Sequence, residues 1–125
     1  MTELRLPQGK HDAAGAQALV DAGYPAVAPL LKGMLEWVQD PNWPVAFVLY
    51  PFLGTIGMPL APFLREVLAT DDEDWIFFVI SELIAPSAAL TAALRDRLQH
   101  LAEHPTPRAR LIGLDELARD TLDDA

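Results

Sequence analysis

An internal repeat of about thirty residues constrains the fold of this chain more than any other feature of its sequence. Residues 28–35 read Ala-Pro-Leu-Leu-Lys-Gly-Met-Leu, and residues 61–68 read Ala-Pro-Phe-Leu-Arg-Glu-Val-Leu, with four identities in eight positions at an offset of 33. Residues 91–98 follow at an offset of 30 and keep Leu94, Arg95 and Leu98. A unit that recurs at such a period buries its apolar face against its neighbours, as helix pairs do in an α-solenoid.

Apolar residues recur at helical spacing within and between these repeats. The second predicted helix, which Pro25 opens, places apolar side chains at intervals of three and four, at Val27, Leu30, Leu31, Met34, Leu35 and Val38. No stretch alternates apolar and polar residues for long enough to indicate a strand. We therefore predict an all-α fold, a HEAT-like α-α superhelix of about three helix pairs plus a C-terminal helix, in a single domain over residues 1–125.

Proline, glycine and capping residues divide the chain into about seven predicted helices. Asp12 caps the first, which runs to Ala22 and ends at Gly23. The later helices have predicted starts at the cap Asn42, near Pro59, after Asp71-Asp72, at the cap Ser87 and at Thr106-Pro107. We predict that the last helix has one apolar side, formed by Leu111, Leu114, Ala118 and Leu122.

The charge of the chain argues against one class of partner and favours another. Eighteen acidic residues outnumber nine basic ones, for a net charge of −9. Binding to nucleic acid needs lysine and arginine to displace counterions from phosphate, so we expect no nucleic-acid role. The charge is also uneven, because residues 1–70 carry six acids and four bases, whereas residues 71–125 carry twelve and five. The acidic half would attract a basic partner, although solubility alone also explains the charge.

Other compositional features remove further classes of function. The chain has no cysteine, which rules out disulfides, thiolate catalysis and thiolate zinc sites. Residues 41–64 contain no charged side chain, but five prolines and two glycines interrupt them, so we expect no membrane-spanning helix there. The first residues lack the pattern of a signal peptide. We therefore expect a cytoplasmic protein.

Several segments together resemble a known bacterial family, the domain of unknown function 5071. The most specific is Glu36-Trp37-Val38-Gln39-Asp40-Pro41-Asn42-Trp43-Pro44-Val45-Ala46, and the others are Lys10-His11-Asp12, Gly23-Tyr24-Pro25, Pro51-Phe52-Leu53, Ile56-Gly57-Met58-Pro59-Leu60 and Asp71-Asp72-Glu73-Asp74-Trp75. The resemblance implies a small HEAT-like helical domain and brings no established activity or cofactor. Ile76-Phe77-Phe78 depart from the polar and aromatic residues that the family tends to have there.

One motif has the spacing of a zinc site. His100-Leu101-Ala102-Glu103-His104 matches the HxxEH pattern of inverzincin peptidases, in which two histidines bind zinc and the glutamate acts as a base. Pro105 ends the helix at once, and a third ligand would have to come from Asp115, Glu116 or Asp120. The alternative is that both histidines interact with the helix dipole in its last turn. We predict no metal ligand and no cofactor for this chain.

The candidate partner-binding residues lie at the starts of two repeat helices. Asp40-Pro41-Asn42-Trp43 and Asp72-Glu73-Asp74-Trp75 share an Asp-x-Asx-Trp pattern at an offset of 32. The acidic run from Asp71 lacks the glycine and distal glutamate of an EF-hand, so it either caps a helix or contacts a basic partner. The tryptophans either pack in the core or anchor an interface. The predicted partner-binding residues are Asp71, Asp72, Asp74, Trp75, Asn42 and Trp43.

These features favour a non-catalytic protein–protein interaction module with no catalytic residues, no nucleic-acid partner and no membrane partner. Its most specific form is a bacterial immunity or inhibitor protein that masks a basic toxin with its acidic half. A generic adaptor or regulatory scaffold is the first alternative. A small zinc-dependent hydrolase that uses His100 and His104 is the second.

Overall fold

The computed structural model describes residues 3–124, and all regular structure within them is helical. The predicted all-α fold is therefore confirmed. The chain forms two compact units, Met1–Ile56 (unit 1) and Gly57–Ala125 (unit 2). The HEAT-like superhelix and the single domain over residues 1–125 stay predictions.

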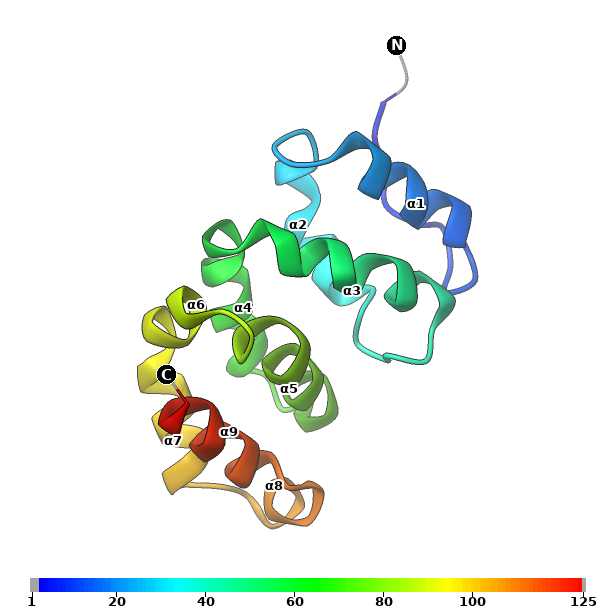
Figure 1. The fold of residues 1–125 in the computed structure, drawn as a ribbon. Coiled ribbons are helices and arrows are strands. Elements are labelled where there is room, and N and C mark those ends of the chain that lie inside the picture. Colours follow the sequence, from blue (N-terminus) through cyan, green and yellow to red (C-terminus); the bar gives the residue numbers. More distant parts are fainter. Residues whose placement is uncertain (1–2, 125) are drawn as a thin grey trace. The chain divides into compact units, whose positions relative to one another are not determined.

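Unit 1 contains three α-helices and one short 3₁₀ segment. They are α1 (Ala13–Ala22), η1 (Ala28–Leu30), α2 (Leu31–Glu36) and α3 (Pro44–Ile56), and α1 packs against α3 (Figure 1). The first helix begins and ends as predicted, because the Asp12 carboxylate accepts a hydrogen bond from the Gly15 N–H at 3.0 Å and Gly23 adopts a φ of 76°.

The second and third helices of unit 1 begin later than the sequence predicts. Residues 24–27 form turns, and Pro29 has no N–H to donate, so the chain reaches α-helical bonding only at α2. Asn42 does not cap α3, which begins at Pro44; instead the Asn42 N–H donates to the Asp40 carboxylate at 2.8 Å in a local turn. The helix then continues through Pro51.

Unit 2 contains more and shorter elements. They are η2 (Met58–Leu60, 3₁₀), α4 (Ala61–Leu68), α5 (Glu73–Val79), η3 (Ile80–Ile84, a π-helical segment), α6 (Ala88–Ala93), α7 (Arg95–Glu103), α8 (Pro107–Ile112) and α9 (Leu114–Asp123). Asp72, Ser87 and Thr106 cap α5, α6 and α8 with side-chain oxygens that accept from N–H groups three residues on, which confirms the predicted starts. In Figure 1, α9 lies beside α7, and these two helices form the most extensive packing in unit 2.

Each unit buries most of the apolar side chains that the helical spacing marks. Leu31 and Leu64, which the repeat alignment makes equivalent, are both buried, as predicted. The buried leucines and isoleucines of unit 2 are Leu60, Leu64, Leu68, Ile76, Ile80, Leu83, Ile84, Leu90, Leu94, Leu98 and Leu114. Burial of these side chains supplies the main stabilising free energy of the unit.

The predicted last helix is in fact two helices. Gly113 adopts a left-handed conformation, with φ 80° and ψ 19°, and separates α8 from α9. Leu114 and Ala118 are buried as predicted, but the side chain of Leu111 is 83% exposed. The prediction that Leu111 shares their apolar side is wrong, because the turn at Gly113 breaks the helical phase between them.

Among residues 3–124, no single helix is both long and apolar enough to cross a membrane. The consecutive segments Pro44–Ile56 and Met58–Leu68 meet the length and composition test only when they are taken together as a broken pair.

Truncation of a buried leucine should destabilise the protein far more than truncation of an exposed one. Leu64→Ala removes a fully buried side chain and should lower the free energy of unfolding by ~2–5 kcal/mol. Leu111→Ala is the matched control, and its effect should stay within ~0.5 kcal/mol. Urea denaturation followed by circular dichroism measures both. Equal losses for the two variants would contradict the assignment of core and surface.

A second pair of substitutions tests the turn between α8 and α9. A methyl group at Gly113 meets no atom within 4 Å, so Gly113→Ala creates no steric clash with neighbouring residues. The substitution should still lower the free energy of unfolding by ~1–2 kcal/mol, because alanine is strained at the positive φ of this position. Gly54 lies exposed inside α3 without a positive φ, and a methyl group there is also unobstructed. Gly54→Ala should therefore stabilise the protein by up to ~1 kcal/mol. The midpoint of thermal unfolding should fall for Gly113→Ala and rise for Gly54→Ala. A Gly113→Ala protein with an unchanged or higher midpoint would argue against the left-handed turn.

Candidate functional site

The acidic segment Asp71-Asp72-Glu73-Asp74 lies at the start of α5, and most of its carboxylates already have structural roles. Asp72 accepts from the Trp75 N–H at 3.1 Å as the helix cap. Glu73 accepts from the Thr106 hydroxyl at 2.7 Å, and Asp74 pairs with Arg108 at 2.6 Å. The start of α5 is thereby tied to the start of α8. Asp71, Asp72 and Asp74 are all exposed, so their charge faces solvent as the partner hypothesis requires.

Trp75 is a core residue rather than an exposed anchor. Its side chain is 9% exposed, and its indole nitrogen Nε1 is buried with no hydrogen-bond partner among the described residues. Trp75 is the third residue of α5, and its backbone N–H donates the capping hydrogen bond to Asp72. A partner that binds the acidic segment would therefore meet the aspartates and not the tryptophan ring.

Asn42 and Trp43 belong to unit 1, whereas the other four predicted partner-binding residues belong to unit 2. Asn42 is exposed, and Trp43 is half-buried with its ring edge-on to Trp37 at 5.9 Å between centroids. Trp43 precedes the first residue of α3, whereas Trp75 lies inside α5. The prediction that the two tryptophans occupy equivalent helix positions is wrong, because Pro44 opens α3 directly after Trp43.

An apolar hollow that the sequence did not reveal opens beside the acidic segment. It has a volume of about 150 Å³ and is lined by Asp74, Phe77, Phe78 and Ile112. The rings of Phe77 and Phe78 meet edge to face at 5.5 Å. Next to Ile112 in α8 is the exposed Leu111. The sequence signal that could have indicated it is Gly113, because a glycine inside an apolar helical pattern often ends a helix.

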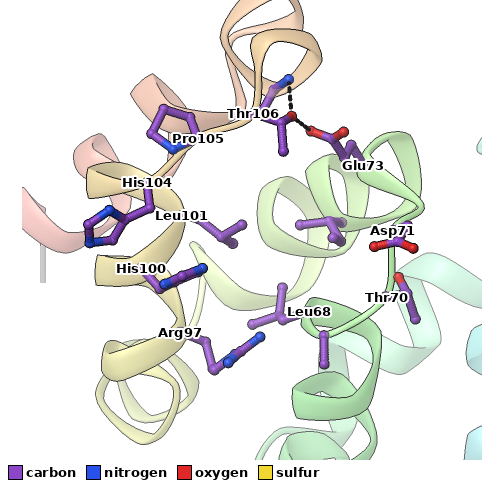
Figure 2. A pocket seen from close by; sticks show the side chains of 13 residues that line it. Leu68, Thr70, Asp71, Glu73, Arg97, His100, Leu101, His104, Pro105 and Thr106 are labelled. Atoms are coloured by element: carbon purple, nitrogen blue, oxygen red, sulfur yellow. Dashed lines mark hydrogen bonds between the residues drawn. The ribbon is translucent and has the colours of Figure 1, made fainter.

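A larger, polar cavity lies within unit 2, and Asp71 and Glu73 of the acidic segment are among its lining residues (Figure 2). Its volume is about 380 Å³. The α7 side carries Arg97 and His100, and the α4–α5 side carries Asp71 and Glu73. Apolar side chains complete it at Leu68, Ile76, Leu101 and Ala109. Side chains of opposite charge thus line opposite walls.

An ion pair next to this cavity links α4 to α7. The Arg65 guanidinium donates to both carboxylate oxygens of Asp96, at 2.8 and 3.2 Å, and to the Ala93 carbonyl at 2.9 Å. The hydrogen bond from Arg65 lowers the pKa of the Asp96 carboxyl group, and the same bond raises the pKa of Arg65. Asp96 is thereby engaged by Arg65, and the neighbouring Arg97 side chain has no carboxylate partner among residues 3–124.

The two histidines of the HxxEH motif lie on α7 and at its end. His100 and His104 are exposed, with ring centroids 5.3 Å apart. Within residues 3–124, no three histidine, aspartate or glutamate side chains gather closely enough to hold a metal ion. Asp115, Glu116 and Asp120 therefore do not supply the third ligand that the zinc hypothesis needs.

The fold and these surfaces define an all-helical protein whose acidic side chains are concentrated in unit 2. The chain matches the model of the family "domain of unknown function" (DUF5071) over residues 5–122. It belongs to that family, as the sequence resemblance indicated. A search of curated proteins found no match.

Proposed function

We propose that this protein is a non-catalytic, cytoplasmic interaction module that binds a basic protein partner through unit 2. The observation that carries the proposal is the apolar hollow, which has the exposed Asp74 in its lining, together with Leu111, the exposed residue that precedes the lining residue Ile112 in α8. An apolar anchor beside charged groups is the usual composition of a protein-binding surface. Asp74 belongs to both features, because it lines the hollow and lies in the acidic segment.

The charge of unit 2 supports a basic partner. Residues 57–125 carry thirteen acidic and six basic side chains, against five and three in residues 1–56. The net charges of −7 and −2 concentrate the negative field on the unit that bears the hollow. Such a field accelerates the encounter with a cationic protein, and the apolar contact then slows dissociation.

In its most specific form, the module is a bacterial immunity protein that masks a basic toxin such as a nuclease. A generic adaptor or regulatory scaffold would use the same surface with another partner. A toxin-like reading frame directly beside the gene favours the immunity role. The zinc-hydrolase alternative lacks a third ligand in this geometry, and stoichiometric zinc in untagged purified protein would be needed to revive it.

Removal of the acidic charge should slow association. The triple variant Asp71→Asn, Asp72→Asn, Asp74→Asn keeps side-chain size, and asparagine at position 72 still caps α5. Affinity capture from the native host should first yield a basic partner. Stopped-flow or surface-based kinetics should then show a lower association rate that has lost much of its salt dependence. An unchanged rate would make the acidic segment a solubility feature.

Truncation of the exposed leucine should act on dissociation instead. Leu111→Ala should speed release of the captured partner and weaken affinity by about tenfold or more, as an interface anchor would. Phe47→Ala is the control, because Phe47 is 69% exposed but lies in unit 1. If Phe47→Ala weakens binding and Leu111→Ala does not, the interface lies on unit 1 and the proposed surface is wrong.

A further inference from the structure

The polar cavity of unit 2 is large enough for a small metabolite. Its volume of about 380 Å³ lies within the usual range for ligand pockets, roughly 300–1,000 Å³. In Figure 2, Arg97 and His100 extend from α7 on one side, while Asp71 and Thr70 lie across the cavity in the loop between α4 and α5. The proposed partner surface at Leu111 and the apolar hollow does not account for this cavity.

Two charged groups in the cavity have no partner within residues 3–124. The Arg97 side chain is half-buried, and it makes no ion pair or side-chain hydrogen bond within residues 3–124. Arg65 engages the carboxylate of Asp96, the residue that precedes Arg97 in the sequence. On the opposite wall, the Asp71 carboxylate also has no partner among the described residues, whereas Glu73 accepts from Thr106. A guanidinium and a carboxylate are thus both available to a ligand.

The chemistry of the walls selects the ligand class. A ligand with only a carboxylate would pair with Arg97 but would be repelled by Asp71 and Glu73. A ligand with only an ammonium group would pair with Asp71 but would be repelled by Arg97. A ligand with both groups satisfies both walls. Between them, Leu68, Ile76 and Leu101 provide apolar surface for an aliphatic side chain.

We propose that this cavity binds a small zwitterion, an aliphatic α-amino acid. Arg97, assisted by His100, holds the carboxylate of the ligand. Asp71 holds its ammonium group. The aliphatic side chain rests against Leu68, Ile76 and Leu101.

Three small probes test the need for both charges. L-leucine, 4-methylpentanoate and 3-methylbutylamine share a carbon skeleton, but the second lacks the ammonium group and the third lacks the carboxylate. Titrations of the full chain followed by ¹H–¹⁵N NMR should show saturable shifts with leucine at residues of α5 and α7. Neither analogue should saturate in the same range. If leucine produces no saturable shift, or if 4-methylpentanoate binds as tightly, the proposal is overturned.

Two variants with matched controls locate the site. Arg97→Gln and Asp71→Asn should each weaken leucine binding by about tenfold or more, since each removes a charge-assisted hydrogen bond. Arg95→Gln and Asp123→Asn remove the same charges from exposed positions outside the cavity, and they should leave affinity unchanged. Circular dichroism confirms that each variant is folded. Equal effects of variants and controls would mean that net charge, and not this cavity, governs binding. The Leu111→Ala partner assay involves neither Arg97 nor Asp71, so failure here leaves the proposed function standing.

Discussion

The shortness of every helix is the constraint on which the rest of this structure depends. The longest, α3, has 13 residues, and α2, α6 and α8 have six each. An isolated helix shorter than ~12–15 residues is only marginally stable in water, so these segments need packing to persist. The buried leucines supply that packing, and caps such as Asp12, Asp72 and Thr106 satisfy the exposed N–H groups at helix starts. Fold and stability are therefore set by apolar spacing and by the residues that interrupt it.

The same interruptions create the surfaces of unit 2. Gly113 turns the chain between α8 and α9, and Leu111 is left in solvent while Leu114 is buried. Thr106 caps α8 and also donates to Glu73, so one residue both starts a helix and ties it to α5. Both residues of this connection line the polar cavity, and Asp74, which follows Glu73, lines the apolar hollow.

Electrostatics in unit 2 are decided by which charges find internal partners. Arg65 pairs with Asp96 and Arg108 pairs with Asp74, both at exposed positions where such pairs contribute little to stability. These two pairs matter more for binding than for stability, because they leave the Arg97 guanidinium and the Asp71 carboxylate unpaired among the described residues, on facing walls of the cavity. The excess of acidic side chains remains at the surface, where it acts on approaching molecules over about a Debye length.

Much of this could be predicted from residue spacing alone. The sequence by itself determined the all-α class, the first helix from Asp12 to Gly23, the caps at Asp72, Ser87 and Thr106, and the burial of Leu31 and Leu64, because each depends on local capping or on helical periodicity. Only the tertiary structure decided that Trp75 is buried, that Leu111 is exposed and that Arg97 faces Asp71 across a cavity. Those outcomes depend on contacts between side chains distant in the sequence and on the backbone conformation at Gly113. The spacing of residues along the chain specifies neither of these.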